Sequence, residues 1–177
     1  MFLHKWIYKV RNFFHRLREF YGTSRTVGRI ACKSELRAIH IKGASGARRD
    51  LGVVSRRVVT NAGVDFMATE FFDGSVLIST FNYHASGTGV AAENVTDVAL
   101  GTEVASRVAG TKTHPSAGVY RTVATISYVA PFTITEHGIF SAAAAGTLWD
   151  RSVFAAIGVV SGDSIQFTYT LTIVAGG

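Results

Sequence analysis

The sequence of 177 residues has one cysteine, two prolines and few charged residues, which make up 17% of the chain. Because Cys32 is the lone cysteine, no internal disulfide can form, and the fold does not depend on oxidation. The longest apolar runs, such as 153–160, are well below the ~20 residues that span a bilayer, so we expect no transmembrane helix. Lys and Arg interrupt residues 1–20, which excludes the uncharged core of a secretory signal and predicts use without export.

The sequence also lacks the motifs that usually carry chemistry. Its six histidines show neither His-x-x-x-His nor His-x-His, the spacings that bring two metal ligands together. Gly87-Thr88-Gly89 has no third glycine and no following Gly-Lys-Ser/Thr, so it does not match a phosphate-binding loop. No Gly-x-Ser-x-Gly turn is present for a nucleophilic serine. We therefore predict no enzymatic activity, no cofactor and no metal site.

Positive charge is concentrated in the first third of the chain. Residues 1–60 contain fourteen Lys and Arg against three acidic residues, a formal charge of +11. Residues 61–177 contain four basic and nine acidic residues, a formal charge of −5. This division predicts a basic N-terminal arm that docks on an acidic or amphipathic partner, joined to a mildly acidic body.

Residues 1–22 are predicted to form an amphipathic helix. Apolar side chains recur every three or four residues from Phe2 to Tyr21, and Gly22 follows as a candidate C-cap. The apolar face suits a groove on a protein, whereas the basic face suits anionic lipid or nucleic acid. Docking on protein is the favoured hypothesis, with membrane and nucleic acid as alternatives. The predicted contact residues are Trp6, Val10, Phe13, Leu17 and Phe20 on the apolar face and Arg11 and Arg16 on the basic face.

Residues 23–50 are predicted to form an extended basic arm that is ordered only by the surface on which it lies. The stretch is polar and basic, and residues 45–50 are typical of an exposed loop. Two arginine pairs, one at the end of the arm and one just beyond it, complete the predicted partner contacts: Arg48, Arg49, Arg56 and Arg57.

Residues 51–177 are predicted to form a β-domain, because the hydrophobic period changes to two. In 164–174 apolar and polar residues alternate strictly, and 119–129 behaves similarly. Residues 61–72 are the one predicted helix of this body. Strands separated by glycine turns, without βαβ alternation, favour an antiparallel β-sandwich of Greek-key or jelly-roll type. The shorter predicted strands are 52–59, 75–80, 95–100, 132–136, 138–140, 148–149 and 153–157.

The body contains two pairs of adjacent ionisable residues whose roles can be predicted, Glu136 with His137 and Asp150 with Arg151. Glu136 and His137 face opposite ways in a strand, so they cannot act as an acid–base pair through their proximity in sequence. Glu136 is instead expected to satisfy a turn or to pair with an arginine such as Arg151. Asp150 and Arg151 are interpreted as an ion pair at a strand end.

Several segments of the body share a pattern with a known class of proteins. They are Ile134-Thr-Glu-His-Gly-Ile-Phe, Leu148-Trp-Asp-Arg-Ser-Val-Phe and Ser161-Gly-Asp with the alternating strand after it. The upstream Phe81-Asn-Tyr-His-Ala-Ser-Gly-Thr-Gly and Ala99-Leu-Gly-Thr-Glu fit the same pattern. Residues 51–177 thus resemble a module common in structural proteins of tailed bacteriophages. The resemblance implies a tight turn at the glycine after Glu136 and His137, an Arg151–Glu136 bridge, and Phe140 and Phe154 in the core.

The resemblance implies a virion protein, made in the host cytoplasm, and such modules occur on capsids, necks, tails and fibres. A capsid decoration (cement) protein that binds the major capsid protein is favoured, because a long basic arm gains contact area on a broad acidic lattice. A neck or tail adaptor or a fibre-attachment protein is the first alternative. A receptor- or glycan-binding β-sandwich is the second. Strand faces rich in Thr, Ser and Ala also predict a symmetric homo-oligomer, with a trimer favoured.

Overall fold

The computed structural model describes residues 29–56, 58–75 and 77–176. Residues Ala31–Val174 form one compact unit. The helix predicted at 1–22, residues 23–28 of the predicted arm and Arg57 lie outside the described residues.

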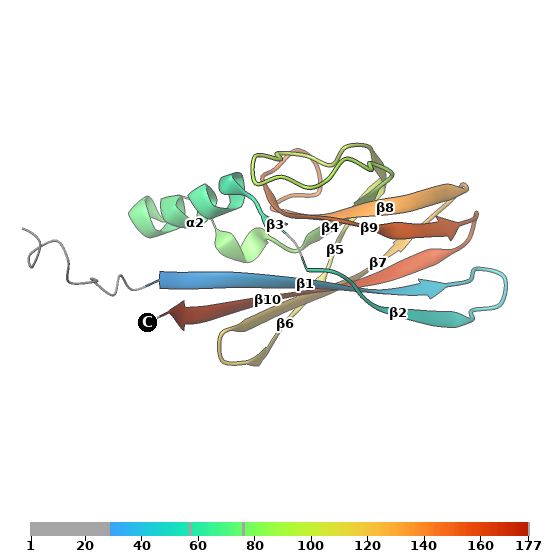
Figure 1. Ribbon diagram of the computed structural model, residues 1–177, viewed down its shortest axis with the longest axis horizontal. Coiled ribbons are helices and arrows are strands. Elements are labelled where there is room, and N and C mark those ends of the chain that lie inside the picture. Colours follow the sequence, from blue (N-terminus) through green and yellow to red (C-terminus); the bar gives the residue numbers. More distant parts are fainter. Residues whose placement is uncertain (1–28, 57, 76, 177) are drawn as a thin grey trace, which may run out of the picture. The chain divides into compact units, whose positions relative to one another are not determined.

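The fold is mainly β, as predicted, and contains two antiparallel sheets of five strands each. One sheet consists of β1 (Arg29–Ile41), β2 (Arg48–Ser55), β6 (Thr111–Ser116), β7 (Val119–Ser127) and β10 (Ser164–Gly176), in the order β2-β1-β10-β7-β6. The other consists of β3 (Val58–Val59), β4 (Tyr83–Gly87), β5 (Glu103–Ala109), β8 (Phe132–Phe140) and β9 (Leu148–Val159), in the order β3-β9-β8-β4-β5. Figure 1 shows the two layers, between which the chain crosses four times.

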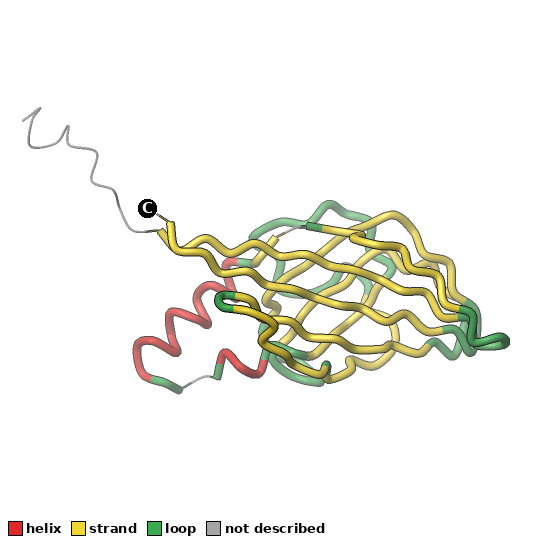
Figure 2. Tube along the Cα trace, turned by 90° about the horizontal axis from the view of Figure 1, so that it is seen from below, coloured by secondary structure: helices red, strands yellow, loops and turns green. Residues whose placement is uncertain are grey.

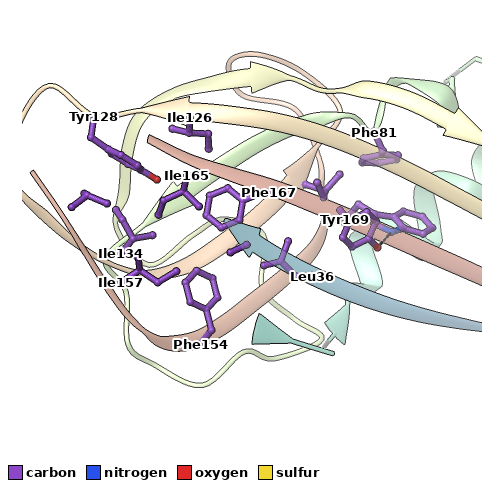
Figure 3. Packing of buried hydrophobic residues seen from close by; sticks show 14 of the residues in the cluster. Leu36, Phe81, Ile126, Tyr128, Ile134, Phe154, Ile157, Ile165, Phe167 and Tyr169 are labelled. Atoms are coloured by element: carbon purple, nitrogen blue, oxygen red, sulfur yellow. Dashed lines mark hydrogen bonds between the residues drawn. The ribbon is translucent and has the colours of Figure 1, made fainter. Parts of the chain in front are cut away.

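The core lies between the sheets, where inward side chains of both layers meet in a sandwich-like arrangement (Figure 3). The alternation predicted for 164–174 is confirmed in β10, where every second side chain from Ile165 to Leu171 is buried and the same face becomes exposed from Ile173 on. The alternation predicted for 119–129 is confirmed as well. The larger inward side chains are Ile126, Tyr128, Ile165, Phe167 and Tyr169 from one side and Ile134, Ile139, Phe154 and Ile157 from the other.

Residues 29–50 do not form an extended arm, because β1 and the start of β2 belong to the first sheet. In β1, Leu36, Ala38 and His40 are buried, while Arg37 between them is exposed. β1 pairs along β2 in antiparallel register. The predicted boundary at residue 51 is therefore wrong for this stretch. A small and a polar residue at two of the three inward positions weaken the hydrophobic alternation that marks a strand.

The helix predicted at 61–72 is confirmed as α2 (Asn61–Asp73). The side chain of Thr60 accepts a hydrogen bond from the N–H of Gly63 at 3.1 Å, which caps the first turn. Gly74 ends the helix in the left-handed conformation, at φ 63°. A short 3₁₀ helix, η1 (Ile78–Thr80), follows and replaces the strand predicted at 75–80.

Other strand predictions need correction. Residues 95–100 form no strand, and 132–136 and 138–140 belong to the single strand β8. The tight turn implied at Gly138 is therefore wrong. A Cβ there would lie 3.0 Å from side-chain atoms of Leu100, Leu148 and Phe140, so packing explains the glycine. The predictions at 148–149 and 153–157 likewise merge into β9, whereas β4, β5 and β6 were not predicted.

Candidate docking surfaces and buried polar clusters

Glu136 is fully buried on β8 and accepts hydrogen bonds from a ring of donors. The N–H groups of Gly89 and Thr102 donate to Oε1 at 2.8 Å, and that of Gly101 donates to Oε2 at 3.0 Å. Arg151 on β9 donates to Oε2 from Nε at 3.0 Å and from Nη2 at 2.8 Å. Burial alone would raise the pKa of Glu136, but these donors outweigh it and lower that pKa.

Arg151 extends this cluster to the loop at 88–102. Its guanidinium also donates to Asp97 Oδ2 at 2.8 Å and to the Ala91 carbonyl at 3.1 Å. We call Glu136, Arg151 and Asp97 the Glu136 clamp, because together they hold the loop against β8 and β9. The predicted Glu136–Arg151 bridge is confirmed. The Asp150–Arg151 ion pair is wrong, because these neighbours lie inside β9 and Arg151 pairs with Glu136 and Asp97.

Two glycines are needed for the clamp to close. A Cβ on Gly87 or on Gly89 would lie 2.5 Å from Oε1 of Glu136, closer than real Cβ atoms approach. The Gly87-Thr88-Gly89 segment, which does not match a phosphate loop, therefore has a packing role. Its two glycines leave space for the carboxylate of Glu136. Sequence reasoning missed this role because Gly87 and Glu136 are far apart in the chain.

His84 on β4 and His137 on β8 form a buried pair between the sheets. His84 Nδ1 lies 3.0 Å from His137 Nε2, and His84 Nε2 lies 3.1 Å from Thr122 Oγ1. His137 Nδ1 has no hydrogen-bond partner in the described part of the chain. Burial lowers the pKa of His84 to about 3, and burial together with the neighbouring His84 lowers the pKa of His137 well below its usual range. Both rings are thus neutral near pH 7.

Asp150 is a second buried titratable group. Its carboxylate lies 3.3 Å from Ser152 Oγ and 3.4 Å from the Tyr169 hydroxyl, which also accepts from Trp149 Nε1 at 2.9 Å. Burial raises the pKa of Asp150 to about 7. Because Asp150 and the two histidines are at most 1% exposed, they support the core in this conformation and do not face a dissolved ligand. No group of three or more metal-binding side chains occurs within the described ranges.

The first candidate docking surface is an apolar patch on α2 and the segment after it. Its members are large hydrophobic residues with high exposure: Val64 (49%), Phe71 (82%), Phe72 (86%) and Leu77 (60%). The inner face of α2 packs on β9 and on the η1 segment, with the Phe66 and Phe81 rings 4.7 Å apart. Two adjacent phenylalanines that are almost fully exposed are unusual on a protein surface, which makes this patch a candidate interaction site. Figure 2 shows α2 at the end opposite the β1–β2 turn.

The second candidate surface is a groove of about 710 Å³ between β2 and β9. We call it the β2–β9 groove. Its volume falls within the ~300–1,000 Å³ typical of ligand sites. Its lining residues are His40, Lys42, Ala47, Arg48, Arg49, Leu51, Val53, Val54, Ala155, Ala156, Ile157 and Gly158.

Asp163 organises the basic end of the β2–β9 groove. Its Oδ2 lies 2.9 Å from His40 Nε2 and 3.3 Å from Lys42 Nζ, and its Oδ1 accepts from the Gly43 N–H at 2.9 Å. The Gly43 N–H, and then the His40 and Lys42 side chains, lower the pKa of Asp163. The carboxylate is 1% exposed and is satisfied by these donors, so it offers no accessible negative charge.

The predicted partner contacts divide into three groups. Arg48 and Arg49 line the β2–β9 groove. Arg56 lies outside that lining and pairs with Glu35 at 3.0 Å on the exposed surface. The other predicted contacts lie outside the described residues: Trp6, Val10, Phe13, Leu17, Phe20, Arg11, Arg16 and Arg57. The apolar patch on α2 was not predicted, although two adjacent phenylalanines at the end of a predicted helix are a visible signal.

Comparisons with protein-family models, with curated proteins and with solved structures find no match for this chain. Within the described ranges, no helix is both long enough and apolar enough to cross a membrane.

Proposed function

We propose that this chain is a non-enzymatic structural protein of a tailed-phage virion, with a β-sandwich body of Greek-key or jelly-roll type. Its favoured role is capsid decoration, in which the body sits on the lattice of the major capsid protein. Synthesis takes place in the host cytoplasm, and assembly delivers the protein to the particle.

The Glu136 clamp is the observation that carries this proposal. The sequence resemblance rests on five segments that are separated in the chain, around residues 81–89, 99–103, 134–140, 148–154 and 161–172. Glu136, Arg151 and the N–H groups of Gly89 and Gly101 come from the first four segments and meet in one buried cluster, whereas the fifth forms the turn before β10 and most of β10 itself. Four of the five segments therefore correspond to one physical unit, which supports the resemblance to phage structural modules over chance matches in a Gly- and Ala-rich chain.

The apolar patch supports an assembly role. Burial of a large apolar side chain stabilises a contact by ~1.5–3 kcal/mol. Phe71 and Phe72 are 82% and 86% exposed. A partner that covers them would therefore bury nearly the whole of both rings and gain most of this free energy for each. A protein subunit is the partner that buries such a patch, because two adjacent aromatic side chains are typical anchors of protein interfaces.

The charge distribution favours the capsid over other locations. The formal charge of +11 on residues 1–60 suits a broad acidic lattice, on which a basic segment adds attraction and contact area. Self-association of the body as a trimer would present several such segments together and strengthen binding through multivalency. A neck or tail position is the alternative, and copy number per particle separates the two.

A patch variant tests the proposed assembly role. Phe71→Ser with Phe72→Ser should fold normally, since both side chains lie in solvent, but should occupy fewer sites on purified particles. Val129→Ser is the matched control, because Val129 is 88% exposed and lies outside the patch. Occupancy can be measured by quantitative mass spectrometry of particles assembled with each variant. Full occupancy with the double variant would contradict docking through α2.

A further inference from the structure

The β2–β9 groove lies between two strand edges that are free in the described residues. β2 is the outermost strand of its sheet and pairs only with β1. β9 pairs with β8 along its length, while β3 covers its other edge only at Asp150 and Arg151. In an antiparallel sheet each strand directs alternate N–H and C=O groups to either side. Residues 152–159 of β9 therefore present unpaired backbone groups on the side of the groove.

The floor of the groove is apolar. Leu51, Val53 and Val54 line it from β2, and Ile157 lines it from β9 together with two alanines and a glycine. The small residues Ala155, Ala156 and Gly158 are exposed on β9, and a Cβ added at Gly158 would meet no atom within 4 Å. The groove of about 710 Å³ beside these residues leaves space for another backbone.

The rim of the groove is basic. Lys42, Arg48 and Arg49 belong to its described lining, which contains no acidic residue. The buried Asp163 contacts Lys42, and the exposed Asp50 on β2 pairs with Arg37 outside the lining. Arg48 donates to Gln166 Oε1 at 3.0 Å, so its charge is not neutralised by an acid. The backbone of Arg49 lies opposite His40 in the β1–β2 pairing, and its side chain makes no hydrogen bond or ion pair with any described residue. The accessible charge of the rim is therefore positive.

We propose that the β2–β9 groove binds an extended acidic segment of a partner protein, which adds a strand to the open edge of β9. In this arrangement the segment's backbone pairs with residues 152–159, its apolar side chains lie on Leu51 and Val53, and its carboxylates pair with Arg48 and Arg49. Strand addition of this kind takes affinity from main-chain hydrogen bonds and specificity from alternate side chains. The site is distinct from the patch on α2 and independent of the virion role.

A peptide titration of the full-length ¹⁵N-labelled protein tests the proposal. The probe is a peptide of about seven residues that alternates valine and glutamate, which spans ~23 Å as a strand. Its binding should shift the backbone amide signals of residues 48–54 and 153–158. The same peptide with methylated backbone nitrogens cannot donate to a strand edge, and a valine–lysine peptide carries the wrong charge. Neither should shift these signals.

A charge exchange supplies the matched variant. Arg49→Glu should weaken binding of the glutamate peptide by about tenfold, because reversal replaces an attraction with a repulsion of similar size. The same variant should gain binding of the lysine peptide. Lys33→Glu makes the same charge change on β1 outside the groove lining and should alter neither affinity.

Three results would overturn the proposal. The first is the absence of shifts in both edges at millimolar glutamate peptide. The second is equal binding of the methylated peptide, which would exclude backbone pairing. The third is binding of a sulfated oligosaccharide or an oligodeoxythymidine at these residues without any peptide binding, which would make the groove a polyanion site.

Discussion

Replacement of Glu136 by alanine should release the loop at 88–102 from the body. The substitution removes the acceptor of three backbone N–H groups and the buried partner of Arg151. Removal of one member of a buried ion pair destabilises proteins by ~3–5 kcal/mol when the remaining charge has no other partner, and the lower end of this range applies here because Asp97 still pairs with Arg151. The loss of folding stability is limited, because each residue of the loop at 88–102 that becomes free regains ~1–2 kcal/mol of backbone entropy.

Hydrogen exchange and thermal unfolding separate the local from the global effect. In Glu136→Ala, the amides of Gly89, Gly101 and Thr102 should exchange much faster, while the amides of β10 keep most of their protection. The midpoint of thermal unfolding should also fall. Glu35→Ala is the matched control, because its exposed pair with Arg56 is worth about 0–1 kcal/mol.

The reasoning would be refuted if Glu136→Ala left the exchange of these three amides unchanged. It would also be refuted if the two alanine variants lost the same stability. In that case the loop would be held by its own contacts, and the clamp would be incidental.

Two further predictions concern the glycines of the clamp and the buried titratable groups. Gly89→Ala should destabilise the protein and speed hydrogen exchange of the loop, because the added Cβ would lie 2.5 Å from Glu136 Oε1. Gly158→Ala is the control and should change stability little, because a Cβ there meets no atom within 4 Å. Equal midpoints of thermal unfolding for the two variants would contradict this prediction. Between about pH 4.5 and 6, the unfolded chain protonates His84 and His137 while the folded chain does not, so these groups make stability fall on acidification by ~1.4 kcal/mol per pH unit each. Asp150, whose pKa is raised to about 7, has the opposite effect, because in this range only the folded state keeps its proton. Asp150→Asn should therefore steepen the dependence of the unfolding free energy on pH by ~1.4 kcal/mol per unit, as measured by urea titration; an unchanged slope would show that Asp150 is ionised in the fold.

The parts of the fold that were predictable from the sequence are those with strong periodicity. β10 and β7 alternate strictly and lie with one face in the core, so their pattern reports their burial directly. α2 was predictable because it has helical spacing and ends at Gly74. β6 could not be found, since all six of its residues are exposed and no alternation results.

The boundary of the body was misplaced for a physical reason. Net charge suggested an arm up to residue 50, but Lys33, Arg37, Arg48 and Arg49 lie on exposed positions of an antiparallel strand pair. The density of charged residues in the sequence reflects only the exposed face of a strand. It does not show whether the opposite face is buried in a core. In β1 the inner side was marked only by Leu36, Ala38 and His40.

The candidate surfaces were less predictable than the fold. The Glu136–Arg151 contact was one of two roles expected for Glu136, and the resemblance implied it. The His84–His137 pair and the Gly89 contact depend on the register of β4 against β8, which sequence spacing does not reveal. The β2–β9 groove depends on which strands end the sheets, so only Arg48 and Arg49 were anticipated there.

The copy number of this chain per purified virion is the most direct test of its proposed role. Quantitative mass spectrometry against the major capsid protein should find hundreds of copies per particle if the chain decorates the head. A single ring of about six or twelve copies would place it at the neck or tail instead. Absence of the chain from purified particles would contradict the virion role altogether.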